Sequence, residues 1–257
     1  MEIWTEGLPV GSGLGSSAAY SVAVATAFLS YIDGITVEEK TEIDGDRPVL
    51  KSLECINAWA FQAERLLQGN PSGVDNTVST FGGAVSFRRW PQVQCIPLVT
   101  MPKIEMMVTP TGITRSSAVL LQRVKEQYDN DTEIITSLFQ TIACISSKAR
   151  ESLENDDTNA MEKKIESCWP RWMELNHVLL TALQVSHPAI EEIRNITATF
   201  DLITKLTGAG GGGCTITILA RTFTRREELK QALMQAGYHP LFTTVGGPGV
   251  LIHSPSD

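Results

Sequence analysis

The chain has no run of lysine and arginine interleaved with aromatic residues, and 29 acidic residues outnumber 21 basic ones, giving a net charge of -8. This balance argues against nucleic acid and anionic membranes as partners. The five cysteines show no CxxC or other metal-ligand spacing, which favours a reducing compartment. The opening residues MEIWTEG resemble no secretory leader, and no apolar run is long enough for a membrane span. We therefore predict a cytoplasmic protein without a membrane segment.

Two common phosphate-binding patterns are also missing. No Gly-Lys dipeptide occurs, which excludes the Walker loop. Gly11, Gly13 and Ser16 nearly complete a dinucleotide-binding GxGxxG, and Asp33 follows at about the expected 20 residues. In that fold the acidic residue follows a second strand, whereas Asp33 ends the helix that the loop begins. We therefore exclude a Rossmann fold.

A glycine-rich stretch, Leu8–Ser17, is nevertheless present and leads directly into an apolar run. The run predicts a buried helix that begins near Ser16. Unpaired N–H groups at a helix N-terminus, together with the helix dipole, favour a bound anion such as phosphate. The alternative is a plain turn capped by Ser16, and the loop alone does not decide between the two.

The mixture of elements predicts an α+β fold, because helices and strands do not alternate regularly. A change of composition after Trp90 suggests two domains, residues 1–95 and 96–257. The expected helices are residues 16–33, 50–68, 74–80, 116–128, 132–153, 159–184 with a break at Pro170, 188–200, and one opened by a capping box at Thr224 and Glu227. The expected strands are residues 3–5, 84–88, 104–109, 202–207, 214–220, 241–245 and 250–253.

Three stretches in order along the chain resemble the signature motifs of the GHMP kinases. Pro9–Ala18 is similar to their phosphate loop, Phe61–Asn76 to their second motif, and Lys205–Cys214 to their third. The second and third motifs are most similar to members that phosphorylate mevalonate. The resemblance implies a two-domain GHMP kinase fold with a truncated N-terminal domain and a ferredoxin-like C-terminal α/β sandwich.

The implied function is ATP-dependent phosphorylation of mevalonate to 5-phosphomevalonate, in isoprenoid and sterol biosynthesis. Mg²⁺ would accompany ATP, and the family suggests a homodimer. One alternative is a non-catalytic nucleotide-binding fragment or dimerisation partner, and a second is another GHMP small-molecule kinase. Family members also have a section before the phosphate loop that supplies strands and a lysine beside the catalytic aspartate. Few residues precede the loop here, so we expect this chain alone to be weakly active or inactive.

Two acidic residues are the main chemical candidates. Glu64 lies on a largely apolar helix, where it is either a surface residue or, if buried, paired or metal-bound. Asp75 follows a tight turn, where an N-cap is the simplest interpretation. The resemblance instead makes Asp75 the general base that accepts the proton of the substrate hydroxyl. It also implies that Glu64 and Ser17 hold Mg²⁺ against the ATP phosphates.

The resemblance assigns the remaining contacts. ATP would be bound by residues of both glycine loops: Pro9, Gly11, Ser12, Gly13, Leu14, Gly15, Ser16, Ser17, Gly208, Gly210 and Gly211. Arg115 and Ala209 would lie beside the substrate, although the sequence around Arg115 departs from the family pattern. Five glycines in Gly208–Gly213 exceed the needs of a turn, which suggests close approach to a ligand or to the first loop.

Overall fold

The computed structural model describes residues 14–33, 47–69, 71–89, 91–98, 101–114, 117–154 and 157–252. The chain divides into two compact units, Met1–Met101 with Gly246–Asp257, and Pro102–Val245. This division falls a few residues after the predicted one, and the final segment groups with the first unit rather than with the second. The strand predicted at residues 3–5 lies outside the described part of the chain.

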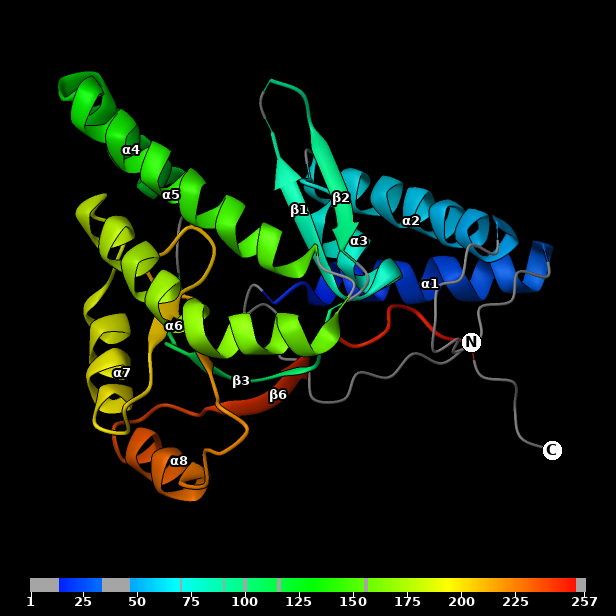
Figure 1. Ribbon diagram of the computed structural model, residues 1–257. Coiled ribbons are helices and arrows are strands. Elements are labelled where there is room, and N and C mark those ends of the chain that lie inside the picture. Colours follow the sequence, from blue (N-terminus) through cyan, green and yellow to red (C-terminus); the bar gives the residue numbers. More distant parts are fainter. Residues whose placement is uncertain are drawn as a thin grey trace. The chain divides into compact units, whose positions relative to one another are not determined.

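The first unit packs three helices beside a β-hairpin (Figure 1). Helices α1 (Ser16–Asp33), α2 (Arg47–Gln68) and α3 (Val74–Phe81) contact one another, and β1 (Ala84–Arg88) pairs antiparallel with β2 (Gln94–Leu98). The core lies mainly between α1 and α2. Its buried residues are Val22, Ala25, Leu29, Ile56 and Ala60.

Helix α1 buries one side rather than its whole circumference. Val22, Ala25 and Leu29, spaced by three or four residues, are almost fully buried, as expected for one helical face. Tyr20 and Phe28 are about half exposed on other faces, at 52% and 50%. The predicted burial of this helix therefore holds for one of its faces only. No helix in the described ranges is long and apolar enough to cross a membrane.

The C-terminal segment of the first unit is held against α3 by backbone contacts. Gly83 N donates to Gly247 O over 3.1 Å, and Val250 N donates to Thr80 O over 3.1 Å. A Cβ at Gly249 would lie 2.0 Å from Thr80 O, so no larger residue fits there without moving the backbone. This close approach explains why glycine occupies that position.

The second unit contains a four-stranded antiparallel sheet of order β4-β5-β3-β6. Strand β3 (Ile104–Pro110) is followed by α4 (Ser117–Asn130), α5 (Thr132–Leu153), α6 (Thr158–Ala182) and α7 (Pro188–Ala198). Next come β4 (Thr204–Leu206), β5 (Cys214–Ile218), α8 (Arg226–Gln235) and β6 (Leu241–Val245). This strand order is that of a ferredoxin-like βαββαβ unit, which confirms the predicted C-terminal architecture.

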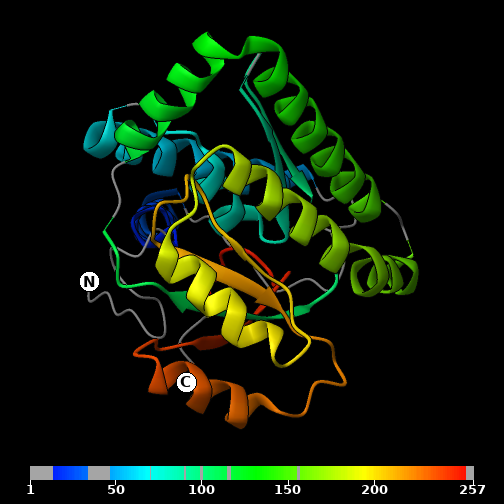
Figure 2. The same ribbon diagram turned by 90° about the vertical axis from the view of Figure 1, so that its left-hand side faces the viewer.

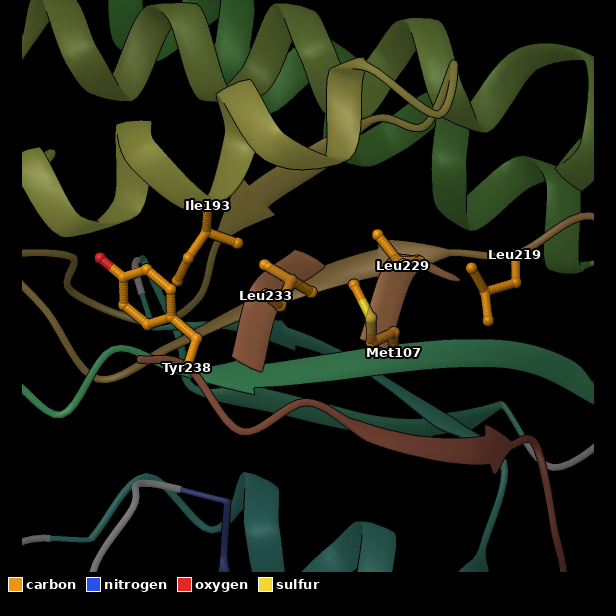
Figure 3. Packing of buried hydrophobic residues seen from close by; sticks show 6 residues of the cluster. All are labelled: Met107, Ile193, Leu219, Leu229, Leu233 and Tyr238. Atoms are coloured by element: carbon orange, nitrogen blue, oxygen red, sulfur yellow. The ribbon is translucent and has the colours of Figure 1, made fainter. Parts of the chain in front are cut away.

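One face of this sheet is sealed by α7 and α8. Figure 2 views the unit from the side of α7, with the orange strand β5 behind that helix. Met107 of β3 packs there against side chains from both helices (Figure 3). The buried members of this cluster are Met107, Ile193, Leu219, Leu229, Leu233 and Tyr238.

Four local predictions need correction. Strand β2 was not expected, and α6 runs through Pro170 without a break. The N-cap of α8 is Arg225 without a side-chain cap, so Thr224 and Glu227 form no capping box. Residues 250–252, the described part of the predicted final strand, are not in a strand.

Replacing Met107 by alanine should destabilise the second unit, because its side chain is fully buried in the cluster. Removing such a side chain costs roughly 2–5 kcal/mol of unfolding free energy. Urea denaturation measures the loss, and Met234→Ala on α8 is the matched control because Met234 is 46% exposed. Equal losses in both variants would contradict this account of the core.

Candidate functional site

A buried carboxylate joins the first two helices of the first unit. Glu64 on α2 is 4% exposed, and its two oxygens accept hydrogen bonds from hydroxyls on α1. Ser17 Oγ donates to Oε2 over 3.2 Å, and Ser21 Oγ donates to Oε1 over 3.1 Å. Both serines can reach the same carboxylate because they are four residues apart on one helical face. The surface alternative for Glu64 is therefore excluded.

Asp75 lies beside the start of α1. A Cβ built on Gly15 would be 3.4 Å from Asp75 Cβ, and Gly15 itself has a left-handed φ of 76°. Asp75 is not the N-cap of α3, because Gly73 occupies that position and Asp75 lies within the first turn. Removal of part of the carboxyl group from water raises the pKa of Asp75, and the negative charge of Glu64 raises it further. The residue as a whole is still accessible to solvent. A raised pKa makes this carboxylate a better proton acceptor.

Helix α3 is positioned by a side-chain network to α2 that the motifs did not indicate. Asn76 Nδ2 donates to Asn57 Oδ1 over 2.6 Å, and Asn57 Nδ2 donates to Thr77 Oγ1 over 3.4 Å. Asn57 and Glu64 are seven residues apart, so α2 presents both from one side. Helix α2 therefore contacts both the serines of α1 and α3, the helix that contains Asp75. No motif in the sequence singles out Asn57 for this role.

The oxygen atoms of Ser17 and Glu64 fit a small divalent cation. An octahedral Mg²⁺ with bonds near 2.0–2.1 Å places neighbouring ligands about 2.9 Å apart, close to the observed 3.2 Å between Oγ and Oε2. Among the described residues there is no group of three or more His, Cys, Asp or Glu side chains suited to a metal. The pair formed by Ser17 and Glu64 matches the way Mg²⁺ is commonly bound, with one or two protein ligands and a shell completed by phosphate oxygens and water.

The second glycine loop, Gly208–Gly213, packs tightly against its own unit. A Cβ on Gly210 would lie 2.0 Å from Val185 O, and one on Gly212 would lie 2.7 Å from Ile113 O. Gly211 N donates to Val185 O over 2.8 Å. Internal packing therefore accounts for three of the glycines. Within the described chain, the N–H groups of Gly208, Ala209 and Gly212 have no hydrogen-bond acceptor.

A buried polar network lies next to the end of β4, the strand that precedes this loop. Fully buried His177 accepts a hydrogen bond from Leu206 N at Nδ1, 3.3 Å away, and its Nε2 contacts Glu191 Oε1 at 2.9 Å. Burial lowers the pKa of His177 despite the nearby Glu191. Burial also opposes ionisation of Glu191, but hydrogen bonds from Ser186, His177 and Arg194 outweigh it and lower the pKa of Glu191 to about 2. The imidazole is therefore neutral and donates from Nε2.

The structure thus brings four predicted residues together in the first unit: Gly15, Ser17, Glu64 and Asp75. Leu14 and Ser16 are the chain neighbours of Gly15. In the second unit, the Ala209 side chain packs against the cluster around Leu120. The remaining predicted residues, Pro9, Gly11, Ser12, Gly13 and Arg115, lie outside the described part of the chain.

Comparisons with known proteins agree on one family. The models described as GHMP kinases N terminal domain and GHMP kinases C terminal match residues 1–83 and 149–240, together more than half of the chain. Mevalonate kinase of Mus musculus is 38% identical over 99% of this chain, and that of Homo sapiens is 40% identical over 98%. The crystal structure of L. major mevalonate kinase in complex with R-mevalonate matches with a TM-score of 0.74 at 25% identity.

The coverage of these relatives is partial. The chain spans 64% of the mouse protein and 63% of the human one, less than two thirds of each. It covers 69% of the L. major chain, while that match extends over 95% of this chain.

Replacing Glu64 by glutamine should lower the pKa of Asp75, because the variant removes a negative charge that raises it. The amide retains the shape needed to bond with Ser17 and Ser21. An NMR titration of the Asp75 carboxyl carbon measures the shift, with Glu54→Gln, an exposed position on α2, as the control. An unchanged Asp75 pKa in Glu64→Gln would refute this coupling.

Acidification should weaken the fold through His177. Its folded pKa lies below the unfolded value of 6.5, so the unfolded chain binds the proton more readily and stability falls as pH drops below 6.5. His177→Gln removes this titration, so its unfolding free energy should vary less between pH 7 and pH 5 than that of the wild type. Urea denaturation at each pH tests this, with exposed His239→Gln as control. The same pH dependence in His177→Gln and wild type would contradict it.

Proposed function

Because the chain belongs to the GHMP kinase family, we propose that it catalyses the ATP-dependent phosphorylation of mevalonate to 5-phosphomevalonate. The observation that supports this most directly is the grouping of Gly15, Ser17, Glu64 and Asp75 within the first unit. Phosphoryl transfer needs phosphate binding, a metal ligand set and a base, and these residues supply one of each.

The proposed roles follow from the local geometry. The N–H groups in the first turn of α1 would bind phosphate, because they have no intrahelical acceptor and the helix dipole favours negative charge there. Ser17 and Glu64 would hold Mg²⁺, which neutralises negative charge on the phosphates when bound. Asp75, which lies beside Gly15 at the start of that helix, would accept the proton of the substrate hydroxyl as the oxygen attacks the terminal phosphate.

The second glycine loop would contribute through its backbone. We propose that Gly208 and Ala209 offer N–H groups to a ligand, since those of Gly210 and Gly211 donate to Thr207 O and Val185 O. Binding of ATP by Pro9, Gly11, Ser12, Gly13, Gly210 and Gly211, and of mevalonate by Arg115, remains a prediction. The family also leads us to propose a homodimer, which light scattering of the purified protein can test. A cytoplasmic location stays a prediction from the cysteine pattern.

Replacing Asp75 by asparagine should abolish turnover while leaving nucleotide binding intact. Loss of a general base lowers the rate by roughly 100- to 10,000-fold. Detection of 5-phosphomevalonate by ³¹P NMR, with calorimetric titration of Mg-ATP, separates chemistry from binding. Asp129→Asn, an exposed position on α4, is the matched control.

The outcomes distinguish the alternatives. Wild-type protein that binds ATP but makes no product would favour a non-catalytic nucleotide-binding protein. Phosphorylation of another alcohol in preference to mevalonate would favour a different GHMP small-molecule kinase. Product formation that is insensitive to Asp75→Asn would exclude Asp75 as the base.

A further inference from the structure

A largely apolar groove lies in the second unit, apart from the residues assigned to phosphoryl transfer. It has a volume of about 210 Å³ and runs between α5, α6 and one face of the sheet. Ile145 of α5 and Trp169 and Trp172 of α6 form one side, and Met106 and Ile216 of the sheet form the other. We refer to it as the α5–α6 groove.

The strand register explains why the groove has an apolar floor. Met106 pairs with Ile218, and Ile216 pairs with Lys205, so these four side chains share one face of the sheet. Met107, the next residue along β3, faces the opposite side and belongs to the cluster in Figure 3. The groove and that cluster therefore occupy opposite faces of the same sheet.

Lys205 is the one cation among the residues that line the groove. Its Nζ donates to Leu206 O over 2.9 Å, and burial lowers the pKa of its ammonium group. An ammonium has three N–H donors. No carboxylate in the described ranges forms an ion pair with Lys205. A half-buried charge without a counter-ion is costly, so an anion arriving at Nζ would stabilise it.

We propose that the α5–α6 groove binds a small organic monoanion, with an apolar body against Trp169 and Trp172 and its anionic head on Lys205. A cavity of about 150 Å³ holds benzene, so this groove suits a body of about eight non-hydrogen atoms. A site with one lysine neutralises one negative charge, so it suits a monoanion better than it suits a polyphosphate. The site goes beyond the proposed kinase function, because none of the residues assigned to phosphoryl transfer lines it.

The ligand class can be tested on the full chain with three probes, in the absence of ATP and mevalonate. We expect 3-phenylpropionate to shift the indole N–H signals of Trp169 and Trp172 saturably in ¹⁵N-labelled protein. Trp59, in the first unit, supplies an internal reference signal that should not move. The neutral 3-phenylpropanol should bind about tenfold more weakly, because it lacks a charge-assisted hydrogen bond to Lys205. Acetate should give no saturable shift, because it lacks the apolar body.

Variants separate the charge from the cavity. Lys205→Met should weaken 3-phenylpropionate binding about tenfold, to the affinity of the alcohol, and leave the alcohol's affinity unchanged. Exposed Lys103→Met is the matched control and should bind both probes as the wild type does. Ala149→Phe, which fills the groove from α5, should abolish binding of both probes. Far-UV circular dichroism checks folding, and Lys205→Met is decisive should Ala149→Phe fail to fold.

Two results would overturn the proposal. One is the absence of a saturable shift at Trp169 and Trp172 in the wild type. The other is unchanged 3-phenylpropionate affinity in folded Lys205→Met. Neither result depends on turnover, so failure of this proposal and failure of the proposed kinase function are distinguishable.

Discussion

The first unit depends on the burial of one carboxylate. Glu64 is removed from water almost entirely, and an unpaired charge there would destabilise the fold by several kcal/mol. Hydroxyls of Ser17 and Ser21 compensate for this burial and in doing so fix the start of α1 against α2. Asp75 lies close enough for its pKa to respond to the same charge. The carboxylate that we propose as a metal ligand thus also holds α1 and α2 together.

Much of the fold followed from residue spacing and helix-ending glycines. The limits of α1, β1 and β6 were predicted to the residue, because a glycine lies beside one end of each: Gly34, Gly83 and Gly246. Strand β2 was not predicted, because the domain boundary was placed within it, between residues 95 and 96. Its proline, Pro97, is tolerated because in a two-stranded hairpin it occupies an edge position, opposite Val85. Helix α6 continues through Pro170 where Trp169 is anchored to Ser152 of the neighbouring helix, so tertiary packing outweighs the local penalty.

The candidate site was predictable only where motifs named its residues. Ser17, Glu64 and Asp75 belong to such motifs, and the structure brings them together. Ser21 and Asn57 were not identified, because an isolated serine or asparagine on a helix has no distinctive pattern. Their roles depend on which helical faces meet, and that is decided by apolar packing between α1, α2 and α3. Residues that position a site are therefore harder to find from sequence than residues that react.

The second glycine loop shows how one sequence feature can serve two requirements. A run of glycines suggested close approach to a ligand, but Gly210 and Gly212 approach the carbonyl oxygens of Val185 and Ile113 instead. The N–H group of Gly211 donates a hydrogen bond to the same Val185 carbonyl. These contacts anchor the loop to its own unit, and within the described residues the N–H groups of Gly208 and Ala209 have no acceptor. If the loop binds an anion as we propose, this packing lowers the entropy lost on binding, so the same glycines can serve both internal packing and a ligand.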